Sequence, residues 1–257
     1  MATRGPLIDT AFRADQDYSR EAAAYDYLHT RGLTGSFAPQ YYGSWTLTLP
    51  VSFTGQGGQF RATQREVRLV LIEYLEGTTL QNVFTRNQPL SADSDGDERD
   101  ASHLPEEYRL EVLAQICDGI VRQHRVGLGQ CDWAARNVIV VPDPHRATLP
   151  AGPAGTAAPR PRIVLIDYNN SVIRAHTKRG HVGIVHDLPP NPAKLFWNES
   201  YPELRGWIPE WWYANKKQRR HWLLDTFASD DAAPNYEPLE DKLDASADSS
   251  DEYDQQD

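Results

Sequence analysis

Two short apolar runs, each bounded by acidic or amide residues, constrain this chain more than any other feature of its sequence. The first run, Val138–Val141, follows a loop that begins at Asp132 and ends at Asn137. The second run occupies residues 163–166 and ends at Asp167. Runs of this length that are rich in Val and Ile are typical of buried β-strands. We therefore expect two strands, with Asp132 and Asn137 before the first and Asp167 at the end of the second.

The charge of the chain is concentrated towards its C-terminal end. Residues 229–257 hold eleven Asp or Glu and one Lys, which equals the whole formal net charge of −10. The rest of the chain has as many acidic as basic residues, and this balance argues against a nucleic-acid-binding face. An apolar content of 40% over 257 residues is enough for the core of one domain or of a two-lobed domain.

The cysteines and the hydropathy pattern bear on the compartment. Cys117 and Cys131 form neither a Cys-x-x-Cys motif nor a disulfide framework. The N-terminus lacks the apolar core of a signal peptide, and no stretch approaches the roughly twenty apolar residues of a membrane span. We therefore expect a reduced intracellular compartment, cytoplasmic or nuclear, and no membrane partner.

Helical and strand-like patterns alternate through the first half of the chain. Apolar residues recur at helical spacing over residues 18–31, and Gly32 follows as a stop signal. Two strand-like runs, Tyr42–Leu49 and Glu66–Glu73, flank a Gly-rich turn. Pro105 then opens a long helix. The apolar face predicted for that helix holds Leu110, Leu113, Ile116, Cys117, Ile120 and Val121.

Three further segments lack any apolar periodicity. Residues 85–104 are polar and acidic, and residues 142–162 are rich in Pro, Ala and Gly, so we expect both to be flexible insertions. Residues 229–257 are rich in Asp and Ser, which predicts a disordered acidic tail. Before the tail, a Trp-rich region ends in a helix predicted at Lys216–Phe227.

The order of these motifs resembles that of a known family. A loop from Asp132 to Asn137 between a long amphipathic helix and a strand, then a second strand ending in Asp167, is similar to the catalytic half of the protein-kinase-like superfamily. The likeness is greatest to the divergent kinase-like proteins common in filamentous fungi, and it covers about residues 18–227. Further similar segments are Arg20–Tyr25, Val67–Gly77, Leu188–Pro192 and Gly206–Trp211.

The resemblance implies an α+β, kinase-like two-lobed fold with an incomplete N-lobe and a mainly helical C-lobe. Residues 1–77 would form the partial N-lobe and the hinge, and residues 78–228 would form the C-lobe with its two insertions. Residues 229–257 would follow as the acidic tail.

The resemblance also implies ATP and Mg²⁺ as cofactors, and it assigns roles to four polar residues. Asp132 would accept a hydrogen bond from the acceptor hydroxyl. Asn137 and Asp167 would supply oxygen ligands to Mg²⁺, which prefers hard oxygen donors. Glu21 would be the helix carboxylate that pairs with a strand lysine in this family.

The adenine site that the resemblance implies lies around the expected hinge. There the carbonyl of Glu73 and the N–H of Leu75 would face the edge of the adenine. Ile72 would be the gatekeeper side chain. Ile139 and Ile166 would form an apolar floor under the base.

The chain departs from the family pattern where the nucleotide phosphates should be held. Its first lysine is Lys178, and only twenty residues precede Glu21, too few for both a Gly-rich loop and a lysine-bearing strand. Leu7 and Ile8 resemble a vestige of that strand, with Arg4 as the only nearby cation. The chain thus resembles an N-terminally truncated member of the family.

The loop residues depart from the pattern as well. Gln130 and Cys131 stand where His and Arg are usual, and Asp167-Tyr168-Asn169 replaces Asp-Phe-Gly. The arginine at the position of Cys131 normally grips a phosphorylated activation segment, so this form of control is not expected.

We therefore expect a kinase-like phosphotransferase that uses ATP and Mg²⁺ and is weak or inactive as this chain stands. Its acceptor is an unidentified protein or small molecule. One alternative is a pseudokinase, a non-catalytic binding or scaffold protein with the same fold. Another is a small-molecule kinase of the aminoglycoside or choline type, which shares the same Asp, Asn and Asp arrangement.

Overall fold

The computed structural model describes residues 10–54, 60–86, 99–144, 160–178, 187–197 and 204–239. Helices and strands both contribute to the fold, so the α+β class is confirmed. The helices are α1 (Thr10–His29), α2 (Leu80–Val83), α3 (Glu106–Arg125), α4 (Pro192–Phe196), α5 (Trp211–Ala214) and α6 (Lys216–Phe227). The strands are β1 (Tyr41–Thr54), β2 (Phe60–Ile72), β3 (Thr78–Thr79), β4 (Thr85–Arg86), β5 (Arg99–Asp100), β6 (Leu128–Gly129), β7 (Val138–Val141), β8 (Arg162–Leu165) and β9 (Val172–Ile173).

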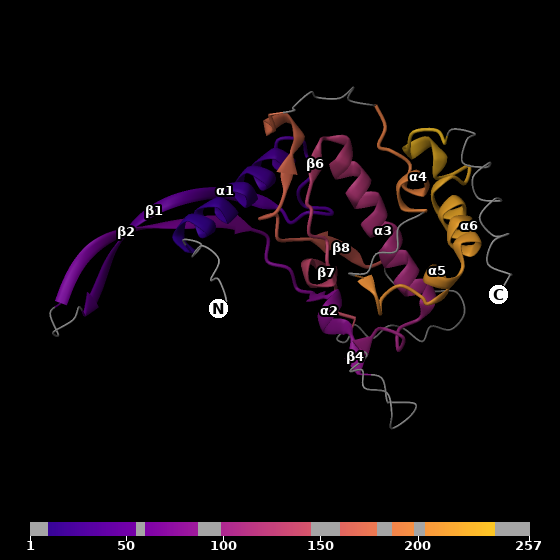
Figure 1. Ribbon diagram of the computed structural model, residues 1–257, viewed down its shortest axis with the longest axis horizontal. Helices are drawn as coiled ribbons and strands as arrows, with labels where there is room; N and C mark the ends of the chain where they lie inside the picture. The colour runs from indigo at the N-terminus through magenta and orange to yellow at the C-terminus, as the bar shows by residue number, and fades with distance from the viewer. Residues whose placement is uncertain are drawn as a thin grey trace, which may run out of the picture.

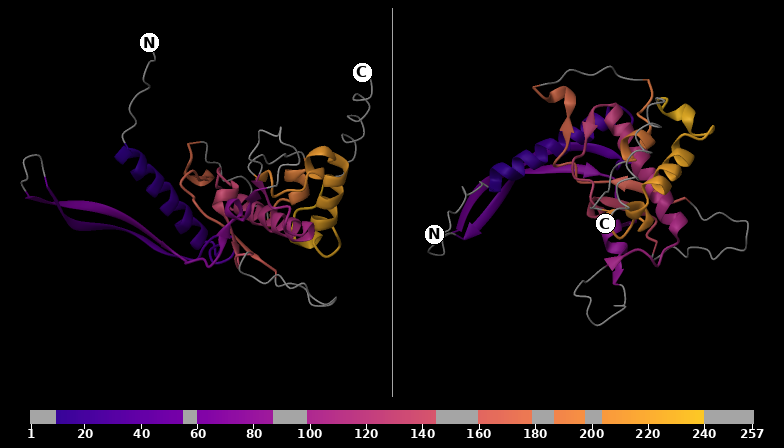
Figure 2. Two further views of the ribbon diagram at one scale, coloured as in Figure 1. Left: turned by 90° about the horizontal axis from the view of Figure 1, so that it is seen from below. Right: turned by 45° about the vertical axis from the view of Figure 1, so that its right-hand side comes forward.

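Strands β1 and β2 form a long antiparallel hairpin that projects away from the body, with α1 beside it (Figures 1 and 2). On the face towards α1, Arg68 pairs with Asp15 at 3.1 Å. On the opposite face Trp45 lies directly across from Leu69, because paired residues of an antiparallel ladder share a face. The exposed large hydrophobic residues of this second face are Trp45, Leu47, Leu49, Leu69 and Leu71. The exposed Arg65, opposite Leu49, lies on the same face.

An aromatic cluster packs helix α1 against the body, and the hydroxyl of Tyr27 adds a hydrogen bond to the carbonyl of Val126 at 2.6 Å. Tyr25 is fully buried, stacks on Tyr41 of β1 and meets the edge of Tyr168 at 5.1 Å between ring centroids. The helix begins at Thr10, eight residues before the expected start, and the chain turns at Gly32 with a φ of +67°. Both hairpin strands are likewise longer than predicted, and Glu73 lies just beyond β2 rather than inside it.

The core of the body is built around α3, with α4, α5 and α6 on one side of it (Figure 1). The predicted apolar face of α3 is buried from Leu113 to Val121, while Leu110 is only half-buried. Helix α6 has the bounds predicted for it, and Asn215 caps its start by accepting the N–H of Gln218 at 2.9 Å. Two tryptophans are fully buried in this part of the core, Trp207 before α5 and Trp212 within it.

A small antiparallel sheet in the order β3-β7-β8 brings the two apolar runs together. Val138 pairs with Leu165, and Ile139 pairs with Val164. Gly77 precedes this sheet at a point where a Cβ atom would overlap the carbonyl oxygen of Val140, so only glycine fits there. The pairing of β7 with β8 places the loop before β7 beside the loop after β8.

The prediction that residues 85–104 form a flexible insertion is wrong at both ends of the segment, which are ordered. Strand β4 pairs with β5, and Ala101 and Leu104 then enter the core. The local composition is polar, but these two apolar side chains are enough to anchor the segment. Residues 87–98 lie outside the described residues.

The insertion predicted at residues 142–162 also includes ordered residues. Arg162 begins β8, and Arg160 pairs with Glu111 of α3 at 2.8 Å. Residues 145–159 lie outside the described part of the chain, as does Arg4.

The prediction of disorder from residue 229 onwards is wrong for residues 229–239. Tyr236 is buried, packs edge-on against Phe227 and donates its hydroxyl to Asp118 at 2.7 Å. The backbone N–H of Glu237 donates to the carbonyl of Pro189 at 2.9 Å. Residues 240–257 are not among those described.

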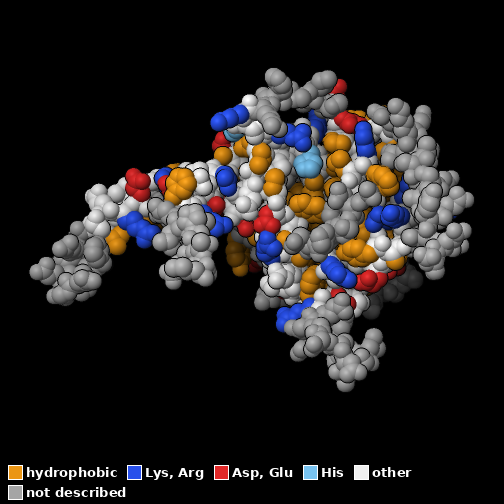
Figure 3. All heavy atoms as spheres, viewed as in Figure 1, with side chains coloured by type: hydrophobic (Ala, Val, Ile, Leu, Met, Phe, Trp, Pro, Cys, Tyr) orange, Lys and Arg blue, Asp and Glu red, His pale blue; other side chains and the backbone are white. Residues whose placement is uncertain are grey.

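The surface of the body carries charges of both signs. On the face seen in Figure 3, basic and acidic side chains are interspersed among hydrophobic ones. Within the described residues, no helix is both long enough and apolar enough to cross a membrane.

Candidate functional site

A cavity of about 330 Å³ lies where α1, the end of β2, β7 and the end of β8 meet. These elements are far apart in the sequence, and the fold brings them to one place. The described residues that line the cavity are Glu21, Tyr25, Ile72, Glu73, Tyr74, Leu75, Ile139, Ile166 and Asp167.

One end of the cavity is apolar. Ile72, Leu75, Ile139 and Ile166 are each half-buried there, so their side chains present surface to the cavity and not only to the core. Aliphatic walls of this kind favour a flat apolar group, and the volume lies in the range of small-molecule sites.

Glu73 ties this end of the cavity to β8. Its carboxylate accepts two hydrogen bonds from Arg162, at 2.6 and 2.8 Å, and one from the backbone N–H of Gln40 at 3.0 Å. The hydrogen bonds from Arg162 lower the pKa of Glu73 to about 2, with the Gln40 N–H adding to the effect. Its side chain therefore fixes the chain just after β2, and its backbone N–H adds a hydrogen bond to the carbonyl of Gln40 at 2.8 Å.

The other end of the cavity is acidic. Burial raises the pKa of Glu21, and the nearby Asp167 carboxylate raises it further, while the backbone N–H of Tyr168 acts in the opposite sense. Tyr25 is fully buried beside them, and its hydroxyl has no hydrogen-bond partner among the described residues. The described lining contains no Lys, Arg or His, so the local field favours a cation or a cation-bearing ligand.

Gln130 holds together the two loops that carry the predicted site residues. Its side-chain amide donates to the carbonyls of Ile166 and Asp167 at 3.2 and 2.8 Å, and its oxygen accepts the N–H of Asp132 at 2.7 Å. In the two loops that Gln130 connects, Cys131 and Asp167 adopt positive φ values of 65° and 61°. Such values are strained for non-glycine residues and cluster at functional sites.

Asp132 is positioned by its neighbours in the loop. Arg136 donates to one carboxylate oxygen at 2.6 Å, and Asn170 donates to the other at 3.5 Å. About a quarter of the Asp132 side chain is exposed, at 25%. The carboxylate is thus held in one orientation and still reaches solvent, as a group that receives a substrate hydroxyl must.

The donor set fits a magnesium ion that is bound together with phosphate. The side-chain nitrogen of Asn137 donates to the carbonyl of Asp132 at 2.7 Å, which leaves its amide oxygen for a ligand. Asp167 supplies a carboxylate at the end of β8. Among the described residues no group of three or more His, Cys, Asp or Glu could hold a metal ion alone. Mg²⁺ commonly uses one or two protein oxygens and takes the rest from water and phosphate.

The structure brings together most of the residues predicted from the sequence. Glu21, Glu73, Leu75, Ile139 and Asp167 line one cavity. Asp132 and Asn137 do not line it; they belong to the adjoining loop that Gln130 connects to Asp167.

Three residues of the site were missed by the sequence reasoning. Arg162 was treated only as the end of an insertion, Tyr25 only as part of a segment with helical spacing, and Gln130 only as a departure from the family pattern. One signal was available: Tyr25 lies four residues after Glu21, which places both on one face of a helix. The other two depend on contacts between distant segments.

Comparison with known proteins gives no independent assignment. No protein-family model matches the chain, and no curated protein matches it.

Proposed function

We propose that this protein is a kinase-like phosphotransferase that uses ATP and Mg²⁺, with a two-lobed, protein-kinase-like fold whose N-lobe is incomplete. The observation that carries the proposal is the convergence on one cavity. Glu73, Leu75 and Ile139, chosen from the sequence for the adenine, share it with Glu21 and Asp167, chosen for the phosphate end.

The roles follow from the chemistry of the cavity. The adenine ring would lie over Ile139 and Ile166, with its edge towards the backbone of Glu73 and Leu75. Asp167 and, from the adjoining loop, Asn137 would hold Mg²⁺, which neutralises phosphate charge in this class of reaction.

Asp132 would accept a hydrogen bond from the acceptor hydroxyl at the adjoining loop. Its contact with Arg136 keeps the carboxylate in one orientation, and positioning supplies much of the rate in reactions of this kind. Asp132 therefore contributes orientation as well as a proton acceptor.

Weak activity is expected because of the acidic end of the cavity. Phosphate groups placed there would face Glu21 and Asp167 with no cation from the described lining residues. Stabilisation by fixed positive groups is usually a large share of catalysis, so its loss lowers turnover more than binding.

The first test measures binding. ATP with Mg²⁺ should raise the melting temperature, and ATP without metal should not. Binding to the folded state alone stabilises it by about 2.7 kcal/mol at a hundredfold excess over Kd. Asp167→Ala should abolish the metal-dependent rise, whereas Asp225→Ala, on the surface of α6, should keep it. An equal shift with and without Mg²⁺ would contradict the metal assignment.

The acidic end of the cavity also favours a second candidate, a pseudokinase that binds nucleotide or a protein partner without catalysis. Phosphotransfer to protein and small-alcohol acceptors separates the two. Turnover that Asp132→Asn removes supports the enzyme. Mg²⁺-dependent ATP binding without turnover supports the pseudokinase.

A further inference from the structure

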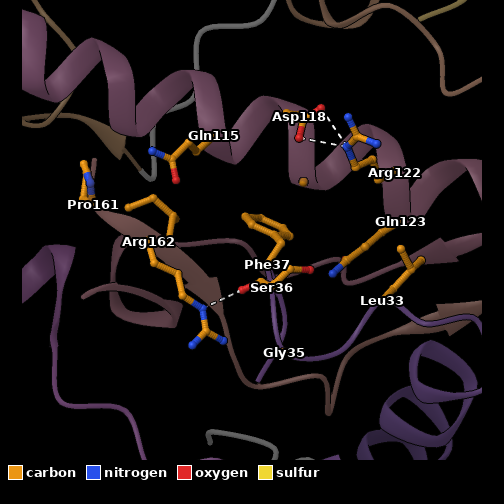
Figure 4. Close-up of a pocket in the computed structure, with 12 residues that line it drawn as sticks. Leu33, Gly35, Ser36, Phe37, Gln115, Asp118, Arg122, Gln123, Pro161 and Arg162 are labelled. Carbon is orange, nitrogen blue, oxygen red and sulfur yellow. Dashed lines mark hydrogen bonds and ion pairs between the residues drawn. The ribbon is translucent and has the colours of Figure 1, made fainter. Parts of the chain in front are cut away.

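Charged side chains in a second, larger cavity, of about 590 Å³ beneath α3, are paired with carboxylates. Figure 4 shows Arg122 bound to Asp118 on one side of Phe37, and Arg162 on the other side. Arg162 is bound in turn by the carboxylate of Glu73. The charges in this lining are therefore already neutralised. The smaller cavity beside α1 differs in this respect.

Two carboxylates at the acidic end of the smaller cavity lack such partners. Glu21 and Asp167 both line it, and no described Lys, Arg or His forms an ion pair with either of them. Glu21 accepts one hydrogen bond, from the backbone N–H of Tyr168. Burial raises the pKa of Glu21, and the Asp167 carboxylate raises it further, which requires the two groups to lie close together. Two close carboxylates without a counterion attract a cation.

A buried hydroxyl in the same cavity also lacks a partner. The side chain of Tyr25 is fully buried and lines the cavity, and its hydroxyl forms no hydrogen bond among the described residues. The two rings that it contacts are satisfied. The hydroxyl of Tyr41 donates to Ser44 at 3.0 Å, and that of Tyr168 accepts a hydrogen bond from Gln123 at 2.6 Å. Buried polar groups normally have a partner, so the Tyr25 hydroxyl indicates a place for a ligand atom.

The three groups together match a primary ammonium. Burial raises the pKa of the Tyr25 hydroxyl, and the nearby Tyr168 phenol and both carboxylates raise it further. The hydroxyl therefore lies within electrostatic reach of Glu21 and Asp167 and stays uncharged. A primary ammonium has three N–H donors, and the phenol oxygen and the two carboxylates provide three acceptors. Hydrogen bonds between charged groups are among the strongest in proteins.

The other end of the smaller cavity is apolar, which favours an organic ligand over a bare metal ion. Ile72, Leu75, Ile139 and Ile166 are half-buried there, and the volume of about 330 Å³ is in the range of small-molecule sites. A metal ion would leave these aliphatic surfaces in contact with water. Among the described residues, no group of three or more His, Cys, Asp or Glu could hold one. An apolar ring that carries an aminomethyl group fits both ends.

We infer that the smaller cavity binds a small apolar primary amine. The ring of the ligand lies over Ile139 and Ile166. Its ammonium donates hydrogen bonds to the carboxylates of Glu21 and Asp167 and to the hydroxyl oxygen of Tyr25. This binding does not depend on the proposed phosphotransfer, but the ring occupies the place proposed for adenine, so the amine and ATP with Mg²⁺ exclude each other.

The binding test compares three probes with one ring system, 2-naphthylmethylamine, 2-naphthylmethanol and 2-naphthoate, in calorimetric titrations of the full chain without nucleotide or metal. The amine should bind more tightly than the alcohol by about 10- to 100-fold, the scale of a hydrogen bond to a charged group. Naphthoate should bind most weakly, because the carboxylates repel it. Equal affinities for the amine and the alcohol would overturn the inference.

A charge-removing variant locates the ammonium. Glu21→Gln keeps the shape of the side chain, and it should reduce the preference for the amine over the alcohol by about tenfold. Asp26→Asn removes a charge from an exposed position of the same helix and should leave the preference unchanged. Equal losses in the two variants would mean that the amine responds only to the overall charge of α1, and the inference would fail.

Tyr25→Phe tests the third acceptor, because it removes one oxygen and keeps the ring. The hydroxyl has no partner among the described residues, so its loss should not lower the melting temperature. The affinity for the amine should fall by about two- to tenfold. A variant that melts and binds the amine as the wild type does would refute this contact.

Competition with nucleotide separates this inference from the proposed function. If the chain binds ATP with Mg²⁺, saturating amine should raise the apparent Kd for ATP at least severalfold. If the chain binds no ATP, the affinity for the amine and its dependence on Glu21 should remain, so the two conclusions fail separately. Amine and ATP bound together, each with unchanged affinity, would place the amine elsewhere and overturn the inference.

Discussion

The ion pair of Glu73 and Arg162 connects residues 89 positions apart and borders both cavities. The guanidinium lowers the pKa of Glu73 from 4.5 to about 2. Because the folded-state pKa lies below the unfolded one, the pair stabilises the fold above about pH 4.5 and loses this contribution as the pH falls towards 2.

Glu73→Gln should therefore lower the free energy of unfolding near neutral pH by about 1–3 kcal/mol, the usual effect of removing a charged hydrogen-bond partner. The difference in the free energy of unfolding between wild type and variant should become smaller as the pH falls through the acid range. Urea unfolding at several pH values measures it. Glu107→Gln, at an exposed glutamate of α3, serves as the control. If the difference in the free energy of unfolding stayed constant into strong acid, the charge of Glu73 would not be the cause of the loss of stability.

At this scale the sequence predicts residues whose roles depend on local pattern. Ile139 and Asp167 were found because each lies at a fixed place relative to an apolar run. Arg162 and Gln130 were not found, because their roles depend on hydrogen-bond partners in other segments of the chain. A side chain that connects two loops by hydrogen bonds produces no periodic sequence pattern in either loop.

Helix α3 offers a case in which helix propensity and packing predict opposite outcomes. Alanine is favoured over glycine inside a helix by about 1 kcal/mol. At Gly119, however, the added methyl group would overlap the ring of Phe37, and overpacking costs about 1–3 kcal/mol. Gly119→Ala should therefore destabilise the protein in urea unfolding.

The double variant Gly119→Ala with Phe37→Leu separates the two effects. If the clash is the cause, the double variant should lose less stability than the two single variants added together, because contacting residues couple. A stabilising Gly119→Ala would mean that the ring moves aside at no cost.

Among the elements, those with strong local signals were predicted well. Helix α6 has the predicted bounds, and the residue that caps its start, Asn215, directly precedes it in the sequence. Residues 229–239, which follow α6, were predicted to be disordered from their acidic composition, and that prediction gave no weight to their one aromatic residue. Tyr236 finds its partners in Phe227 and Asp118, and the latter is 118 positions away.

For the whole molecule, residues 229–239 act as part of the folded body. Deleting residues 229–257 removes the buried Tyr236 with its hydrogen bond, and also the contact of Glu237 with Pro189. Losing these contacts should lower the free energy of unfolding by about 2 kcal/mol. The melting temperature should therefore fall by about 4–8 °C, because each kcal/mol shifts it by about 2–4 °C in a chain of this size. A chain ending at Leu239 keeps these contacts and should melt clearly higher. Equal melting temperatures for the two truncations would show that the segment adds no stability.

The hairpin of β1 and β2 has a consequence for how this molecule opens. In the described residues its strands pair only with each other, and its buried anchor, Tyr41, lies at the end next to the body. A ribbon held at one end loses its hydrogen bonds from the free end inwards, as a zipper does. Each amide along the hairpin should therefore exchange with solvent at a rate that reports its distance from Tyr41.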